Sequence, residues 1–286
     1  MSLIEDYFKE RLVSLGYPKT LEIHFSLNSC QGDGVAFYGY ISQITLNNLM
    51  NRLLDPNRKG ISSVDRVKCL MMHPCIIPMM NFFSEFAMRD MGIQKNSYAN
   101  HYSHFNTMTL SDASFEILDV SLDEKFESWS LEHEVTKEDL PEWSKIWSYF
   151  VQMLKADIVK TSKILESDGY AFLSALSSET VVTREFFTKN FVVRLSELEY
   201  DGEDFGEMDC EDMSFVKNMI DGKMRFIALG AEVLDRETKT VLGKYSYYGI
   251  PYDQGDRTYG GFAAEVVSNA ISDTRALVNR LKLKVA

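Results

Sequence analysis

Two apolar runs near the N-terminus, residues 21–27 and 35–41, are separated by a segment that contains Gly32-Asp33-Gly34. Glycine adopts positive φ angles without steric cost, and aspartate tolerates them. The first run alternates in polarity, which is typical of a strand with one buried face. We therefore predict a β-hairpin whose structural turn includes Gly32, Asp33 and Gly34. A phosphate-binding loop is disfavoured, because the segment leads into a strand and no lysine follows it.

The remaining pattern predicts helices and strands in separate groups rather than in strict alternation. Apolar spacing predicts helices at 3–16, 44–55, within 63–92, and at 141–165, 168–176, 212–220 and 260–283. The cap-like segment Ser177-Ser178-Glu179 predicts a further short helix at 179–189. Strands are predicted at 97–110, 113–122, 191–195, 224–234 and 240–250. We expect an α+β fold, in which an antiparallel sheet of β-hairpins (21–41, 97–122 and the strand near 191) packs on apolar helices, followed by a C-terminal hairpin-plus-helix unit.

A strongly acidic segment interrupts the chain at 197–212, where there are nine acidic residues and no lysine or arginine. Such a change of composition is typical of a boundary. The sequence therefore predicts an α+β body at 1–196, an acidic loop at 197–212 and a C-terminal unit at 213–286. The acidic segment lacks the ordered ligand spacing of a calcium loop, so a solvated loop is the simpler interpretation.

The formal net charge of −12 disfavours direct binding to nucleic acid or to an anionic membrane, because both require a basic surface. No window approaches the length of about 18 apolar residues that spans a membrane. The N-terminus lacks the basic start and apolar block of a signal peptide. The four cysteines are scattered, which favours reduced thiols, and we expect a cytoplasmic protein.

Catalytic and metal-binding motifs are weak in this chain. There is no Gly-x-Ser-x-Gly motif. His101 and His104 are three apart on a predicted strand, where they would point to opposite faces. Cys69 and His73 lie among apolar residues that indicate a core. We expect no enzyme activity, cofactor or metal, with a hydrolase or nucleotide-binding enzyme built around Asp33, His101 and His104 as the alternative.

Two groups of residues are candidates for contact with a protein partner. Tyrosine is enriched at interface hot spots, and Tyr245 and Tyr247 alternate on one predicted strand face. Acidic side chains could match a basic groove on a partner. Ordinary sheet packing and a solvated loop are the respective alternatives. The candidate partner-binding residues are Glu203, Asp204, Glu207, Asp209, Tyr245, Tyr247, Tyr248 and Tyr252.

Within residues 20–195 the chain resembles a family of small hypothetical proteins found mainly in bacteriophages. The segment from Phe25 to Phe37 is similar to the family's "FS…SQGDGA-F" signature, with Cys30 where serine is usual. The stretch from Tyr102 to Met108 is similar to the "Y-x-H…T" strand. The stretch from Tyr170 to Phe191 resembles the "Y-x-x-L-x-S-D-E…E…N" ending, with Ser178 where aspartate is usual.

The resemblance implies a phage origin, and the family has no established activity to transfer. Phage proteins that are acidic and lack enzyme motifs are often inhibitors of host defence, and this chain is similar in size and character to phage inhibitors of the Gabija nuclease–helicase complex. We therefore expect a non-enzymatic, homo-oligomeric inhibitor in the host cytoplasm that binds a defence protein complex and blocks its DNA binding or cleavage. A structural or virion-associated protein is a further alternative.

Overall fold

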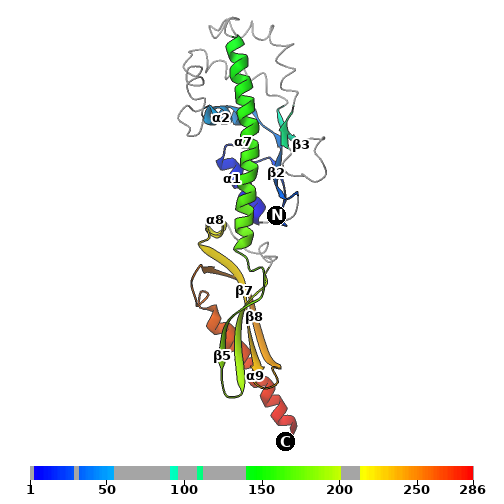
Figure 1. Ribbon diagram of the computed structural model, residues 1–286, viewed down its shortest axis with the longest axis vertical. Helices are drawn as coiled ribbons and strands as arrows, with labels where there is room; N and C mark the ends of the chain where they lie inside the picture. The colour runs from blue at the N-terminus through cyan, green and yellow to red at the C-terminus, as the bar shows by residue number, and fades with distance from the viewer. Residues whose placement is uncertain are drawn as a thin grey trace. The chain divides into compact units, whose positions relative to one another are not determined.

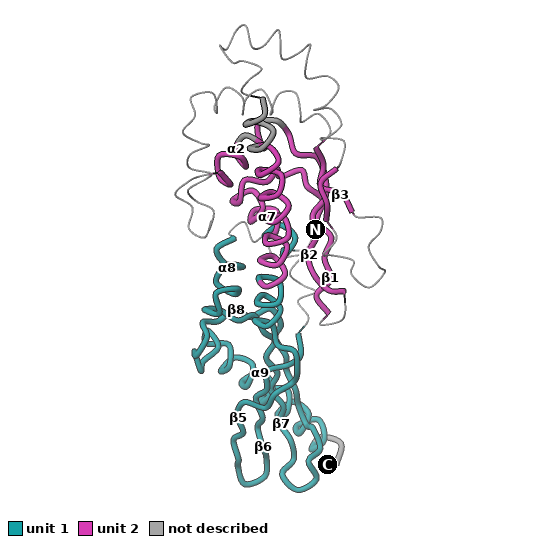
Figure 2. Tube along the Cα trace, turned by 45° about the horizontal axis from the view of Figure 1, so that its top comes forward, with its two compact units in different colours: residues 1–7, 168–286 teal, residues 8–167 magenta. Residues whose placement is uncertain are grey.

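The computed structural model describes residues 3–28, 32–54, 91–95, 108–111, 140–200 and 213–285. These residues form an α+β fold with two antiparallel four-stranded sheets, as expected. The chain divides into two compact units, one of residues 8–167 and one of residues 1–7 and 168–286 (Figures 1 and 2). Each sheet belongs to one unit, so the units are described separately.

The first sheet has the strand order β1-β2-β3-β4. Its unit takes most of helix α1 and of the long helix α7, and all of α2. The bounds are α1 Leu3–Ser14, β1 Glu22–Ser26, β2 Gly34–Tyr40, α2 Gln43–Leu53, β3 Gly92–Lys95, β4 Met108–Leu110 and α7 Leu140–Ser174. Phe8, Phe37 and Phe150 are fully buried, which places helical and strand residues in one core. The hydroxyl of Ser162 on α7 donates to the Val35 carbonyl of β2.

The first hairpin is confirmed. Phe25 lies opposite Val35 and Ser26 opposite Gly34 in an antiparallel ladder. Gly32 and Gly34 have φ angles of 99° and 149°, which explains the glycines in this segment. The Asp33 carboxylate accepts a hydrogen bond of 2.8 Å from the Ser26 hydroxyl, so this side chain helps to close the turn. Of the strands expected at 97–110 and 113–122, only 108–110 falls within the described residues.

A buried polar group joins three parts of this unit. Asp157 on α7 is almost fully buried and accepts a hydrogen bond of 2.8 Å from the Tyr17 hydroxyl. The Arg52 guanidinium of α2 forms an ion pair with the same carboxylate. Burial, together with the charge of Asp157, raises the pKa of Tyr17 above its ordinary value. The phenol therefore stays protonated and continues to donate to the carboxylate.

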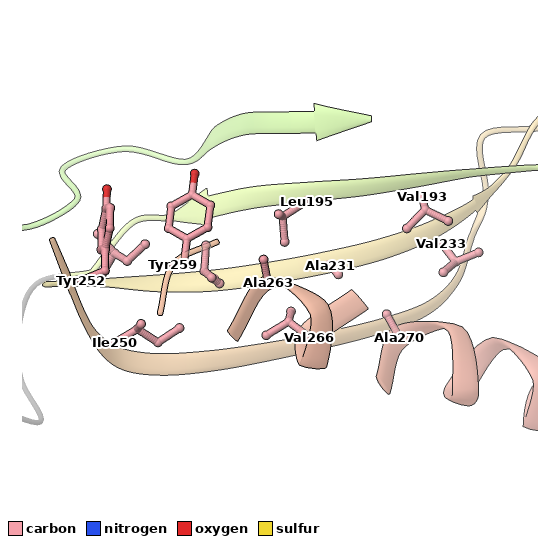
Figure 3. Close-up of a cluster of buried hydrophobic side chains, with 12 residues drawn as sticks. Val193, Leu195, Ala231, Val233, Ile250, Tyr252, Tyr259, Ala263, Val266 and Ala270 are labelled. Carbon is pink, nitrogen blue, oxygen red and sulfur yellow. The ribbon is translucent and has the colours of Figure 1, made fainter. Parts of the chain in front are cut away.

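The second sheet is a meander with the order β5-β6-β7-β8. The bounds are β5 Val181–Phe187, β6 Phe191–Leu198, α8 Ser214–Ile220, β7 Met224–Asp235, β8 Val241–Asp253 and α9 Phe262–Val285. Helix α9 packs on one face, where Leu195, Leu229 and Ile250 meet Val266 and Ala270 (Figure 3). The expected C-terminal hairpin and helix are thus confirmed as β7, β8 and α9.

Several expectations for the middle of the chain were wrong. The helix expected at 168–176 is the end of a single helix, α7. The helix expected at 179–189 is strand β5, whose valine, threonine and phenylalanine residues suit a sheet. The strand near 191 is β6, which pairs with β5 and β7 in the second sheet rather than with the first. The two compact units divide at Asp168, and the boundary expected at 197–212 stays a prediction, because 201–212 lie outside the described residues.

Within the described ranges, no helix is long and apolar enough to cross a membrane.

Candidate interaction surface

Strand β8 is an edge of the second sheet, and it carries the tyrosines that the sequence indicated. Tyr245 lies opposite Ala231 and Tyr247 lies opposite Leu229 on β7. Ala231 and Leu229 belong to the core under α9, and residues opposite each other share a face. Tyr245 and Tyr247 therefore stand side by side on the α9 face, as expected. Their exposures of 36% and 37% show that the edge strand leaves them partly open to solvent.

Strand β8 is held tightly against α9. The ring of Tyr247 packs on that of Phe262 with centroids 5.0 Å apart. The backbone N–H of Lys244 donates to the Asp273 carboxylate at 3.4 Å. A Cβ atom at Gly243 would lie 2.3 Å from the Thr274 hydroxyl oxygen, so only glycine fits the observed spacing. The exposed tyrosines are thus carried by a strand with a fixed position on its helix.

Tyr248 points away from this pair. The register between β7 and β8 shifts between Ile227 and Leu229, which marks a β-bulge beside Tyr248. The Tyr248 ring lies 6.4 Å from that of Tyr200 and is 54% exposed. Gly249 follows with a φ angle of 73°, a conformation that favours glycine. The bulge therefore presents one tyrosine on the side of the sheet opposite to Tyr245 and Tyr247.

Tyr252, a candidate for partner contact with core packing as its alternative, lies in the core. It is 8% exposed and belongs to the core cluster, as does Tyr259. The Glu197 carboxylate accepts hydrogen bonds from the hydroxyls of Tyr259 at 3.1 Å and Tyr252 at 3.5 Å. Arg225 donates to the same carboxylate at 3.0 Å and to the Tyr252 hydroxyl at 3.2 Å. The rings of Tyr252 and Tyr259 have a structural role, because they pack in the core while their hydroxyls bond to Glu197.

The surroundings of Tyr252 and Tyr259 also keep their hydroxyls protonated. Burial is the main cause that raises the pKa of Tyr252 and of Tyr259, and the negative charge of Glu197 adds to it. Both phenols therefore keep their protons at neutral pH and act as donors. Glu197 was counted in the acidic segment, but it lies on β6, and its partners come from β7, β8 and the loop before α9. Nothing local in the sequence joins these positions.

The opposite edge strand, β5, is a second exposed apolar surface that sequence reasoning missed. Val181 and Val182 are exposed at one end, and Phe186 and Phe187 at the other. Exposed apolar edge strands invite pairing with another chain. Glu185 on this strand forms an ion pair of 2.9 Å with Arg194. The signal was present in the adjacent pairs Val181-Val182 and Phe186-Phe187, whose residue types favour strands, but the cap-like Ser177-Ser178-Glu179 led to a helix prediction.

The other candidate residues lie outside the described residues. These are Glu203, Asp204, Glu207 and Asp209 of the acidic segment, and also Cys69, His73, His101 and His104. In the part of the chain that the structure describes, no three histidine, cysteine or acidic side chains gather closely enough to hold a metal ion. The site that can be built from described residues is therefore a surface, formed by β5, β8 and α9.

Comparisons with protein-family models, with curated proteins and with solved structures found no match to this chain. The case for a function therefore depends on the chemistry of this surface.

Proposed function

We propose that this protein is a non-enzymatic phage inhibitor that binds a host anti-phage defence complex of the nuclease–helicase type, similar to Gabija, through the second sheet. The observation that carries the proposal is the pair of partly exposed tyrosines, Tyr245 and Tyr247, on one face of edge strand β8. The phage context comes from the resemblance of residues 20–195 to a phage family, and the host cytoplasm is the corresponding location.

Tyrosines placed in this way suit recognition of a protein. A tyrosine buries a large area and has few rotatable bonds, so little conformational entropy is lost on binding. Here the ring of Tyr247 is already positioned by Phe262, which lowers this cost further. The exposed edge of β8 also offers backbone groups to which an extended partner segment can pair. Tyr248 extends the contact surface to the other side of the strand.

Inhibition would follow from covering a surface that the defence complex needs for its DNA. An acidic protein bound beside a DNA groove repels the phosphate backbone, and the net charge of −12 provides that repulsion. The acidic residues Glu203, Asp204, Glu207 and Asp209 would reinforce it by contacting a basic groove. Assembly into a homo-oligomer would increase the effective affinity by allowing several contacts at once.

Co-purification provides the test. A tagged form of the full chain would be expressed in host cells that carry one defined nuclease–helicase defence system, and captured under mild salt. We expect the defence proteins to be captured in a fixed ratio, and DNA cleavage by the purified complex to fall when the protein is added. Failure to capture any subunit, with cleavage unchanged at saturating protein, would contradict the proposal.

A further inference from the structure

An apolar groove of about 480 Å³ lies between α9 and one end of the second sheet. Its sheet side is formed by Phe191, Val193 and Val233. Its helix side is a stripe along α9 that runs from Ile271 to Lys282. Val193 and Val233 belong to the core cluster, and Phe191 and Ile271 pack against it, so the floor of the groove is a continuation of the core.

The groove continues toward the β5 edge. Phe186 lies opposite Val193 on the neighbouring strand, and side chains in opposite positions share a face. Phe186 is 49% exposed and thus adds an open aromatic ring beside the groove. The stripe from Ile271 to Lys282 covers three turns of α9, or about 17 Å at 1.5 Å per residue. A bound segment of about three helical turns would match this length.

The rim of the groove is basic, in contrast to the chain as a whole. Arg275 and Lys282 line it, and neither forms an ion pair with any described residue. Residues 275–286 contain four basic residues and no acid, although the full chain has a net charge of −12. An apolar floor with cations at the rim is complementary to a helix that is apolar on one face and acidic beside it.

We propose that this groove binds an acidic amphipathic helix of the partner protein, an inference that rests on the proposed function and adds the chemistry of the partner. The apolar side chains of the helix, spaced i, i+3, i+4 and i+7, would fill the groove and contact Phe186. Its carboxylates would pair with Arg275 and Lys282. Nucleic acid is a poorer match, because an apolar floor offers nothing to a phosphate backbone.

Fluorescence anisotropy of the full chain with a labelled synthetic peptide tests this directly. The probe is a 16-residue peptide with leucines at the i, i+3, i+4 and i+7 spacing and glutamates elsewhere. Two peptides serve as controls, one of the same composition with its leucines scattered around the helix and one with lysine in place of glutamate. We expect saturable binding of the probe and at least tenfold weaker binding of both controls.

Matched variants locate the site. The variant with Arg275→Glu and Lys282→Glu should bind the probe peptide about tenfold more weakly or worse, since two ion pairs become repulsions. Arg280→Glu with Lys217→Glu makes the same change of charge at exposed positions outside the groove and should leave the affinity within about twofold. Val278→Trp should weaken the probe similarly by filling the groove without a change of charge. Urea unfolding of each variant confirms that it is folded.

The proposal is overturned if the probe does not bind, if the lysine peptide binds equally well, or if both charge variants weaken the probe equally. It is also overturned if a short DNA duplex binds in a manner that depends on Arg275 and Lys282 while the probe does not. A shift to a dimer that is abolished by Val278→Trp, without probe binding, would assign the groove to a second copy instead. Capture of the defence complex is measured in a separate experiment. Absence of peptide binding would therefore contradict the groove proposal but not the proposed function.

Discussion

The Glu197 carboxylate accepts a hydrogen bond of 3.1 Å from the Tyr259 hydroxyl, which is 62 positions away in the sequence. Together with the bonds from Tyr252 and Arg225, this contact joins β6, β7 and β8 to the loop that begins α9. A single carboxylate thus fixes the end of the second sheet that leads into its covering helix.

Replacement of Glu197 by glutamine should lower the free energy of unfolding by about 2 kcal/mol, because Arg225 then loses its charged partner in a largely buried setting. Urea denaturation measures the change. Glu199→Gln is the matched control, since it makes the same substitution at an exposed position two residues later, and it should change stability by less than about 0.5 kcal/mol. Equal effects of the two substitutions would contradict the structural role of Glu197.

Stability should fall at high pH. Because the pKa values of Tyr252 and Tyr259 are raised in the folded state, the unfolded chain loses these protons first, above pH about 10. The stability that the two protonated phenols contribute is fully present below that pH and is lost as the pH rises through their folded-state pKa values. Urea unfolding at pH 9 and pH 11 should therefore show a steeper loss for the wild type than for Tyr252→Phe with Tyr259→Phe. An unchanged slope would show that these phenols are not coupled to folding.

Asp157→Ala should destabilise the protein by about 3–5 kcal/mol, because it leaves the Arg52 guanidinium and the Tyr17 hydroxyl without their buried acceptor. Asp157→Leu combined with Arg52→Met should recover part of this loss, since it removes the unpaired Arg52 charge but still leaves the Tyr17 hydroxyl without its acceptor. Thermal and urea unfolding of both variants provide the measurement. A double variant as unstable as Asp157→Ala would show that packing, rather than an unpaired charge, causes the loss.

Gly243→Ala should lower the free energy of unfolding by about 1–3 kcal/mol or more, because its Cβ would collide with the backbone and hydroxyl of α9 at Thr274. Gly230→Ala is the comparison within the same sheet. Its Cβ would meet only the flexible side chain of Leu198 at 3.0 Å, so a smaller cost is expected. Unfolding curves for the two variants test whether β8 and α9 pack as closely as described. A milder effect at Gly243 than at Gly230 would contradict that packing.

Local signals in the sequence predicted the parts of the fold that depend on neighbouring residues. The glycines around Asp33 predicted the first hairpin, and apolar spacing predicted β7, β8 and α9. Competition between signals caused the errors. The long helix α7 continues past the expected end because Leu165 and Phe172, seven residues apart, are both buried. Strand β5 forms where a cap pattern favoured a helix, because β6 is available to pair with it.

The candidate surface was only partly predictable for the same reason. Alternation placed Tyr245 and Tyr247 on one face, and the register confirms it. The burial of Tyr252 depends on Glu197 and Arg225, which are 55 and 27 positions away, and no local pattern reports such distances. The exposed Phe186 and the apolar groove with its basic rim depend on how β5, β6 and α9 come together. These features required the fold itself.

The most direct test of partner binding compares capture of the defence complex by the wild type and by Tyr245→Ala with Tyr247→Ala. Both side chains are partly exposed, so the variant should remain folded while its affinity falls by at least tenfold, since hot-spot tyrosines contribute about 2 kcal/mol or more. Tyr40→Ala is the matched control, because it removes a highly exposed tyrosine of the first sheet, and it should capture the defence complex as well as the wild type does. Capture by the folded double variant at wild-type affinity would contradict the proposed interface.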